Sequence, residues 1–316
     1  MIVRWGLDEL PGLLAEAEIE RPFVIASPRW SKLALPGGAG LWAEVPSARA
    51  VVPPDADGIL AVGGGSAIDT GKHASAQSGL PVVHVPTTYS GAEWTTFYGI
   101  RSPDRRMQGG GAGARPVGVL YDIDLTLGLP RAATAGTALN ALAHCAEALY
   151  VRGHSPEGDE QALAGARLIS DALPSVLADG SDRAAREELL RGAMHGGHAL
   201  ALTGLALAHA LAQALGGTYG IAHGAMNALC LPPALAFNRE VVPAEVGRFG
   251  EAIGGDAVER SRELALLGGF ERLRDFDVPE DDLPRVAQAT AERAGNQANP
   301  RPATPAEILE LFRSIW

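Results

Sequence analysis

Cysteine is almost absent from this sequence: Cys145 and Cys230 are its two examples in 316 residues. They have no CxxC spacing, which excludes a disulfide framework and a thiolate zinc site. Both lie among apolar and small residues, where we expect buried, unreactive thiols. A chain of this length can bury a core large enough to fold without such cross-links.

Positive charge is also scarce, since 26 Lys and Arg against 37 Asp and Glu give a formal net charge of −11. The long-range field of such a protein repels phosphate, so we expect no binding to nucleic acid or to acidic lipid. The first residues lack the basic start and long apolar stretch of a signal peptide. We therefore expect a cytoplasmic protein.

Residues 199–217 form one long run without charge, nearly long enough to cross a bilayer. The run is rich in Ala, however, and carries His209 and Gln213 in its middle. This composition predicts a helix buried on all sides within a globular domain. We expect no association with a membrane.

Short apolar runs alternate with turn or helical segments near the start of the chain. Four of these runs are predicted strands, at residues 23–26, 59–62, 82–85 and 117–121. Continuous apolar runs joined by crossovers indicate a parallel sheet that is covered on both faces. The glycine-rich stretch 102–116 is expected to be an exposed loop or a short hairpin.

The later part of the sequence is rich in Ala and Leu and has helical periodicity. Breaks in this pattern occur at 254–256, 275–282 and 299–302. The sequence therefore predicts a dinucleotide-binding α/β domain with a parallel sheet over residues 1–130. An all-α domain is predicted over residues 131–316.

A glycine-rich turn, Gly63-Gly64-Gly65-Ser66, follows the second predicted strand and precedes a helix. Glycine permits a close approach of backbone, and a helix N-terminus offers N–H groups and a positive dipole end. These features predict a pyrophosphate site with Ser66 as a cap or donor, and Asp69 is a further cofactor-binding candidate. A strand–turn–helix connection with no ligand remains an alternative, because neither the GxGxxG fingerprint nor the GxxxxGK(S/T) loop is present.

Hydroxyl side chains follow the third predicted strand, at Thr87, Thr88 and Ser90. Ligands of open α/β sheets lie at the carboxyl ends of the strands. Two such turns after two strands of one sheet favour a shared dinucleotide. The alternative is a Ser/Thr turn that caps a helix.

Three histidines stand out in the helical part, namely His144, His209 and His223. Asn140 precedes His144 by four residues, so the two side chains share one face of a helix. Histidines in apolar surroundings commonly have a hydrogen-bond partner or a chemical role. Taken singly, each could also be a satisfied core residue.

Together these segments resemble the iron-containing alcohol dehydrogenases. The matching motifs appear in the family's order and are GGGSAIDTGK, PTTYSGAE, DIDLTLGLP, LNALAHCAEALY, LAHALAQALGGTYGIAHG and NPRP. The tyrosine after PTT, the LNALAH segment and the terminal NPRP resemble the maleylacetate reductase branch in particular. The resemblance implies the dehydroquinate synthase-like fold of that family, with an N-terminal dinucleotide domain and a helical C-terminal domain.

The resemblance also implies a degenerate metal site. In metal-dependent members an Asp and three His hold a divalent ion, and their positions match Asn140, His144, His209 and His223. A neutral Asn removes the anionic ligand, which weakens such a site. Maleylacetate reductases share this substitution and are regarded as working without metal, so we expect no bound metal here.

Two features depart from the reductase pattern. Four residues after His209 the family carries another histidine near the substrate and nicotinamide, whereas this chain has Gln213, which cannot shuttle a proton near neutral pH. Segment 28–58 contains Pro36, Pro46, Pro53 and Pro54 where a strand–helix unit is expected, and it is too short for that unit. A Lys of the family corresponds to Arg106, which we include among the cofactor-binding candidates.

The resemblance therefore implies a reductase that uses NADH or NADPH and transfers hydride to a small unsaturated or keto carboxylate. Asn140, His144, His209, His223 and Gln213 are the candidate catalytic residues. Arg29, which follows the predicted strand 23–26, could accept a 2′-phosphate but does not decide between the two dinucleotides. A homodimer is expected from the family. Alternatives are a non-redox dehydratase, isomerase or cyclase, and a catalytically silent binding protein.

Overall fold

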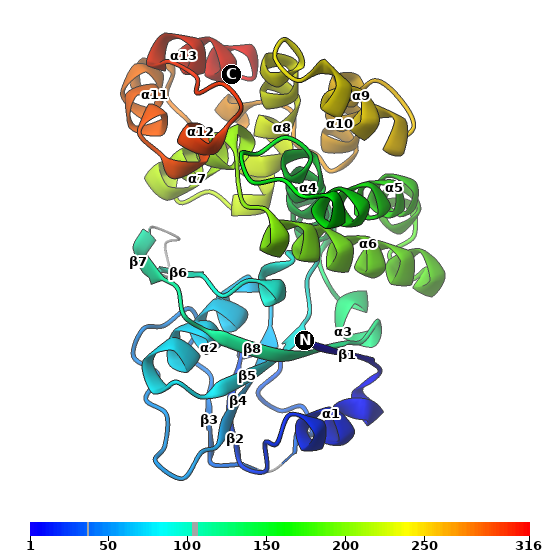
Figure 1. The fold of residues 1–316 in the computed structure, drawn as a ribbon, viewed down its shortest axis with the longest axis vertical. Helices are drawn as coiled ribbons and strands as arrows, with labels where there is room; N and C mark the ends of the chain where they lie inside the picture. The colour runs from blue at the N-terminus through cyan, green and yellow to red at the C-terminus, as the bar shows by residue number, and fades with distance from the viewer. Residues whose placement is uncertain (37, 103–106) are drawn as a thin grey trace. The chain divides into compact units, whose positions relative to one another are not determined.

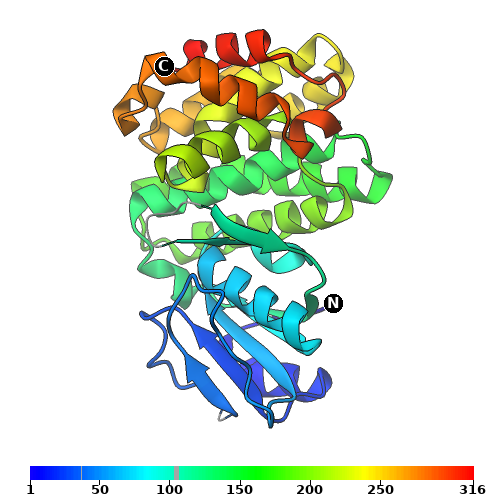
Figure 2. The ribbon, with the colours of Figure 1, turned by 90° about the vertical axis from the view of Figure 1, so that its left-hand side faces the viewer.

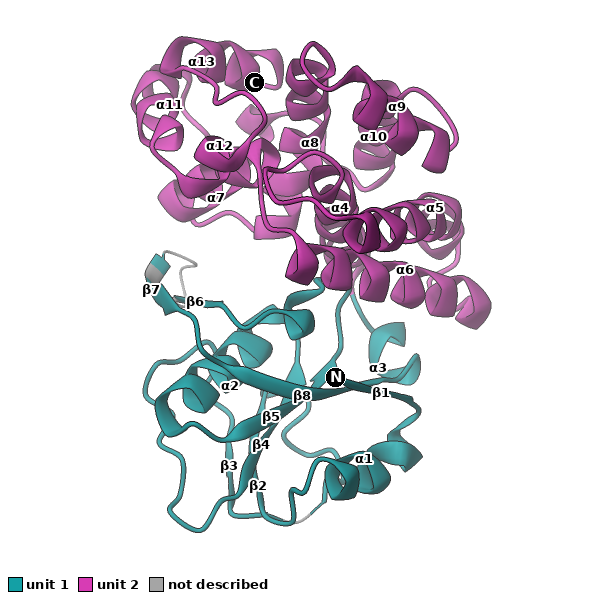
Figure 3. Ribbon diagram, in the orientation of Figure 1, with its two compact units in different colours: residues 1–129 teal, residues 130–316 magenta. Residues whose placement is uncertain are grey.

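The chain divides into two compact units, Met1–Leu129 and Pro130–Trp316, shown in different colours in Figure 3. The computed structural model describes residues 1–36, 38–102 and 107–316. A six-stranded parallel sheet lies in the first unit, and the second unit is helical (Figure 1). The predicted fold class is therefore confirmed.

The first unit is built around one sheet with strand order β1-β8-β5-β4-β2-β3, in which every neighbouring pair is parallel. A separate antiparallel pair, β6 and β7, forms a hairpin. All four strands predicted from the sequence are present. The elements are β1 (Ile2–Trp5), η1 (Leu7–Glu9), α1 (Leu10–Glu16), β2 (Pro22–Ala26), β3 (Gly40–Trp42), β4 (Gly58–Gly63), α2 (Gly65–Ser78), β5 (Pro81–Pro86), η2 (Ala92–Trp94), β6 (Tyr98–Arg101), β7 (Met107–Gly111), β8 (Arg115–Tyr121) and α3 (Asp124–Leu127).

Helices cover both faces of this sheet, as the parallel pattern predicts (Figures 1 and 2). Successive side chains of a strand point to opposite faces. On one face Leu60 packs in a cluster with Leu13 of α1. On the other face Ile59 and Ala61 pack in a cluster with Ile68 of α2. Because both faces are buried, the central strands β4 and β5 are mostly apolar instead of alternating, and the one histidine of β5, His84, is buried as well.

The segment between β2 and β4 contributes little regular structure. Its one strand, β3, pairs in parallel with β2 and ends the sheet at that edge. Among the described residues of this segment there is no helix. Proline lacks a donor and clashes inside a helix, and the five prolines of this segment disfavour the strand–helix unit that the family pattern would place there.

The second unit consists of helices and short 3₁₀ turns. Several helices begin with a side-chain cap: Ser155, Asp182 and Asp256 each accept a backbone N–H, and Thr304 forms a capping box with Glu307. The elements are α4 (Arg131–Ala148), α5 (Pro156–Ala178), α6 (Arg183–Leu202), α7 (Leu207–Tyr219), α8 (His223–Arg239), α9 (Pro243–Ala252), α10 (Ala257–Leu267), η3 (Leu273–Phe276), η4 (Glu280–Asp282), α11 (Leu283–Ala291), α12 (Ala294–Ala298) and α13 (Pro305–Ser314).

The uncharged run 199–217 is not one helix, and that prediction is wrong. Helix α6 ends at Leu202, α7 begins at Leu207, and the two are bent by 101° at the break. Gly204 in the break has a φ of +131°, a backbone conformation that residues other than glycine rarely adopt. No single helix among the described residues is long and apolar enough to span a membrane. The bent pair α6 and α7, taken together, would be long and apolar enough by length and composition alone.

Candidate functional site

The glycine-rich turn joins β4 to α2 in the first unit. Gly63 has a φ of +146°, and a Cβ atom there would lie 2.8 Å from the Ala67 Cβ and from the Ser27 Oγ. Gly64 is the N-cap of α2 and makes no side-chain cap bond. The turn therefore requires glycine, and it presents the start of α2 without a side-chain cap.

The hydroxyl-bearing turn lies beside the glycine turn, because β4 and β5 pair with Gly63 opposite Pro86. The Thr87 backbone N–H donates to the Gly63 carbonyl at 3.0 Å. A Cβ atom on Gly64 would lie 3.0 Å from the Thr88 Cγ2. The structure thus brings together the two turns that the sequence analysis singled out separately.

The hydroxyls of the second turn have different surroundings. The Thr87 Oγ1 accepts a hydrogen bond from the Trp30 Nε1 at 3.2 Å, so Thr87 helps to hold this turn. The Thr88 Oγ1 is buried and has no hydrogen-bond partner among the described residues. Ser90 Oγ would lie 3.8 Å from a Cβ atom on Gly65. A buried hydroxyl without a hydrogen-bond partner is uncommon in a folded protein, so Thr88 is a candidate for contact with a ligand.

Asp69 makes contacts that hold neighbouring elements of the first unit together. Its Oδ1 pairs with the Lys72 Nζ at 2.8 Å, and its Oδ2 accepts the Gly99 N–H at 3.2 Å. Lys72 is 1% exposed and donates further hydrogen bonds to the carbonyls of Ala92 and Phe97. Asp69 and Lys72 therefore hold the β6 hairpin and η2 against α2. Cofactor binding by Asp69 stays a prediction, and Ser66 lies exposed on the first turn of α2.

Two arginines of the first unit, Arg29 and Arg115, donate hydrogen bonds to backbone carbonyls. Arg29 donates to the Gly128 carbonyl at 2.9 Å. Arg115 stands at the amino end of β8 and donates to the Gly79 carbonyl at 2.6 Å. In a parallel sheet that end is opposite the edge that carries the glycine turn. Arg106 lies outside the described residues.

A buried polar group lies next to these turns, on η2 and β8. The Tyr121 hydroxyl donates to the Glu93 Oε1 at 2.8 Å and accepts from the Trp94 Nε1 at 2.8 Å. Burial of Glu93 raises its pKa to about 7. His84 is also fully buried, which lowers its pKa to about 3, and its Nδ1 lies 2.9 Å from the Glu93 carbonyl oxygen. Sequence reasoning did not identify this group.

In the second unit, helix α4 presents three polar side chains on one face. Asn140, His144 and Glu147 are spaced by four and then three residues, which is one side of an α-helix. All three are at most 5% exposed. The sequence analysis named the first two and missed Glu147, although its spacing from His144 repeats the same face.

His209 on α7 is held from two sides. Its Nδ1 lies 2.7 Å from the Glu147 Oε2, and its backbone N–H donates to the Glu147 Oε1 at 3.1 Å. Its Nε2 lies 3.4 Å from the Asn140 Oδ1. The His144 ring stacks on it with centroids 4.7 Å apart, and burial, followed by the charges of His209 and His223, lowers the pKa of His144.

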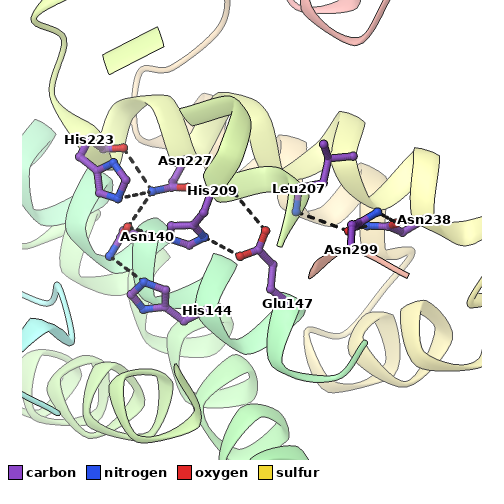
Figure 4. A network of polar contacts seen from close by, with 9 residues as sticks. All are labelled: Asn140, His144, Glu147, Leu207, His209, His223, Asn227, Asn238 and Asn299. Carbon is purple, nitrogen blue, oxygen red and sulfur yellow. Dashed lines mark hydrogen bonds and ion pairs between the residues drawn. The ribbon is translucent and has the colours of Figure 1, made fainter. Parts of the chain in front are cut away.

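Asn227 on α8 links the remaining members, as Figure 4 shows. Its Nδ2 donates to the Asn140 Oδ1 at 2.7 Å and lies 3.0 Å from the His223 Nε2. The His209 and His223 rings are 5.6 Å apart. We call Asn140, His144, His209, His223, Asn227 and Glu147 the imidazole–amide cluster. Asn227 was missed, though it follows His223 by four residues and therefore shares its helix face.

Two glycines allow α4 and α8 to approach closely at this cluster. A Cβ atom on Gly224 would lie 2.3 Å from the Gly136 carbonyl oxygen. Gly136 precedes Asn140 by one turn of α4, and Gly224 follows His223 directly. The backbone contact therefore brings the start of α8 next to Asn140. Gln213, one turn after His209 on α7, is partly buried.

The donor atoms of the cluster do not fit a divalent metal ion. The Asn140 Nδ2 faces the His144 Nε2 at 3.5 Å, and the Asn227 Nδ2 faces the His223 Nε2, so amide N–H groups meet two of the imidazole lone pairs. The one carboxylate of the cluster, Glu147, contacts the Nδ1 of His209, whereas the Nε2 of that ring faces Asn140. Among the described residues no group of three His, Cys, Asp or Glu could hold a metal ion.

Comparison with known proteins places the chain in a family. Residues 134–316 match the C-terminal model of the Fe-containing alcohol dehydrogenase family, and residues 45–122 match the iron-containing alcohol dehydrogenase model. A maleylacetate reductase of Sphingobium indicum is 36% identical over 260 residues, 82% of this chain and 73% of that protein. Maleylacetate reductase 1 of Cupriavidus pinatubonensis is 34% identical over 93% of this chain and 88% of its own length.

Solved structures agree with this assignment. A putative alcohol dehydrogenase from Ralstonia eutropha is similar with a TM-score of 0.89 and 32% identity, covering 100% of this chain and 95% of that one. Maleylacetate reductase from Agrobacterium tumefaciens is similar with a TM-score of 0.87 and 28% identity, with the same coverage. The chain therefore belongs to the iron-containing alcohol dehydrogenase family of NAD(P)-dependent oxidoreductases, in its maleylacetate reductase-like branch.

Proposed function

We propose that this protein is an NADH- or NADPH-dependent reductase of a small unsaturated or keto carboxylate of the maleylacetate type, and that it works without a bound metal. The imidazole–amide cluster carries the proposal. It gathers three imidazoles and two amides, all of them buried except the partly buried His223, and the donor atoms of that group do not fit a metal ion. The maleylacetate reductases among its relatives support the substrate class.

The proposed reaction divides the work between two groups of residues. A bound dinucleotide supplies the hydride, and the turn at Gly63–Ser66 would hold its pyrophosphate at the N-terminus of α2. Thr88 and Ser90 would donate hydrogen bonds to the nicotinamide half. Reduction of a carbon–carbon or carbon–oxygen double bond takes one hydride and one proton, and the imidazoles would deliver the proton or hold a substrate carboxylate.

Within the cluster, Glu147 would fix the orientation of the His209 ring by accepting a hydrogen bond at Nδ1. The Nε2 atom, which lies 3.4 Å from the Asn140 Oδ1, would then be the nitrogen that takes up or gives the proton of the reaction. Gln213 can donate a hydrogen bond but cannot exchange a proton near pH 7, so the proton would come from a histidine of the cluster.

A fluorescence titration with NADH and NADPH tests the first half of the proposal and decides between the two dinucleotides. Gly64→Ala places a methyl group 3.0 Å from the Thr88 Cγ2, and we expect it to weaken binding about tenfold or more. Gly12→Ala, whose Cβ meets no atom within 4 Å, is the matched control and should leave binding unchanged. Absence of binding by either dinucleotide at millimolar concentration would contradict the proposal.

Turnover and metal content test the second half. Maleylacetate and related 2-enoate or keto acids should be reduced with oxidation of the dinucleotide. Activity should survive dialysis against a chelator, with far less than one iron or zinc per chain by elemental analysis. Binding of a dinucleotide without turnover of any such acid would favour a non-redox reaction, and a tightly held stoichiometric ion would overturn the metal-free mechanism.

A further inference from the structure

Helix α7, which carries His209, begins inside the protein without a cap of its own. The first N–H groups of a helix have no partner within the helix, and burial denies them water. The N-cap residue is Ala206, which has no side chain able to accept a bond. Ala206, Leu207, Ala208 and His209 are each at most 1% exposed. The first turn of α7 therefore needs acceptors from elsewhere in the fold.

Two side chains that are distant in sequence supply these acceptors. The Asn299 Oδ1 accepts the Leu207 N–H at 3.4 Å, and the Glu147 Oε1 accepts the His209 N–H at 3.1 Å. Glu147 also contacts the His209 ring, so one carboxylate holds both the backbone and the imidazole of that residue. Figure 4 shows the two acceptors on either side of the first turn of α7.

Asn299 is itself held rigidly. It forms a reciprocal amide pair with Asn238 of α8, with its Nδ2 2.6 Å from the Asn238 Oδ1 and its Oδ1 3.1 Å from the Asn238 Nδ2. Its Nδ2 also donates to the Arg301 carbonyl at 2.9 Å. Both asparagines are fully buried. Pro300 follows, and a residue before proline is restricted to extended conformations, as the φ of −62° and ψ of 149° at Asn299 show.

We propose that Asn299, with Glu147, is a surrogate N-cap that sets the position of α7 and thereby aims His209 in the imidazole–amide cluster. Asn299 is in this view a positioning residue: it acts through the backbone of α7. This gives the asparagine of the terminal NPRP motif a role that the proposed reduction did not include. The effect on catalysis rests on the proposed function, whereas the effect on α7 does not.

The test compares two buried asparagines of the same region. Asn296 is 1% exposed, and its side chain makes three hydrogen bonds to the backbone, at Ala291 and Ala303, neither of which belongs to α7. Asn296→Ala is therefore the matched control for Asn299→Ala, since both lose buried amide bonds. Hydrogen exchange of the full chain, followed by mass spectrometry on peptides covering residues 206–213, reports the first turn of α7 without any need for activity.

We expect Asn299→Ala to speed exchange in the first turn of α7 roughly tenfold, and Asn296→Ala to leave it unchanged. Asn299→Asp keeps the acceptor oxygen and, with its buried carboxyl protonated, one donor for Asn238 or Arg301, so it should restore part of the protection. This variant also serves if the alanine variant does not fold. In the reductase assay Asn299→Ala should lower kcat about tenfold with little change in dinucleotide affinity.

Equal exchange in the wild type and Asn299→Ala would overturn the proposal. So would an equal loss of kcat in Asn296→Ala at a similar loss of thermal stability. If the wild type reduces no substrate, the exchange result still decides the role of Asn299, and failure of the proposed function is then seen separately.

Discussion

At the scale of single residues, Asn140 decides the chemistry of the cluster. Its amide oxygen lies between the Asn227 Nδ2 and the His209 Nε2, and its amide nitrogen faces the His144 Nε2. One side chain therefore offers an acceptor and a donor to three neighbours. A carboxylate at this position would offer acceptors alone and a negative charge, which is what a divalent ion needs from its ligands.

Asn140→Asp is therefore expected to create a metal site. The carboxylate replaces an N–H group that faces the His144 Nε2 with an oxygen, and Glu147 already orients His209 in the way that supports metal ligands. We expect affinity for Zn²⁺ or Fe²⁺ to rise at least tenfold over the wild type by calorimetric titration. Adding His144→Ala to this variant should remove the gain. Equal affinities in Asn140→Asp and the wild type would contradict the expectation.

The burial of Glu93 leads to a second prediction, which concerns how the stability of the protein depends on pH. Burial raises its pKa from the ordinary 4.5 to about 7, so the folded state binds more protons than the unfolded state between these values. Stability should therefore fall as pH rises through this window, by up to about 3 kcal/mol, and the loss is complete above the folded pKa.

Replacement of Glu93 by Gln keeps the shape and removes the titration. Urea unfolding at pH 5 and pH 8 should show that the wild type loses about 3 kcal/mol more than Glu93→Gln over this interval. Glu9→Gln, at an exposed position, is the control and should behave as the wild type does. Equal pH dependence in the wild type and Glu93→Gln would show that Glu93 titrates normally.

At the scale of elements, the crossing of α4 and α8 shapes the cluster. The two helices touch through backbone at Gly136 and Gly224, and each helix then presents its polar residues one turn further on. Asn140 and Asn227 meet because of that contact. Larger residues at the crossing would separate the two amides.

Gly224→Ala is expected to destabilise the protein by about 3 kcal/mol. Its Cβ would lie 2.3 Å from the Gly136 carbonyl oxygen, and the two helices could move apart only if the residues of the cluster moved with them. Gly217→Ala on α7, where a Cβ meets no atom within 4 Å, is the control. That substitution should be neutral or stabilise by about 0.5–1 kcal/mol. Chemical denaturation measures both values, and equal effects would exclude a special role for the crossing.

At the scale of the whole molecule, the net charge of −11 opposes the approach of an anionic dinucleotide. Salt shortens the Debye length from about 30 Å at 0.01 M to about 8 Å at 0.15 M. We therefore expect the association rate of NADH, measured by stopped-flow fluorescence, to rise severalfold over this range.

Reduced nicotinamide riboside carries no charge, and its association rate should change little with salt. A rate for NADH that falls as salt is added would mean that a local positive field outweighs the net charge.

Much of this fold could be predicted from local patterns. Apolar runs predicted β2, β4, β5 and β8, and the glycine run predicted a turn at Gly63, whose φ of +146° requires glycine. Patterns of this kind depend on residues that are close together in the sequence, so they can be recognised without the tertiary structure. The break after Leu202 was missed because the run of apolar residues continues through it, while the bend depends on Gly204 and on packing.

The sequence by itself determined the family, the two kinds of secondary structure and the histidines of the candidate site. Only the tertiary structure decided which groups those histidines meet. Glu147 lies 62 residues from His209, and Asn299 lies 92 residues from Leu207. Hydrogen bonds across such separations form only after the helices have packed, because the backbone must first bring a donor and an acceptor within about 3 Å. Spacing along the chain therefore revealed the imidazoles but not the amides and the carboxylate that orient them.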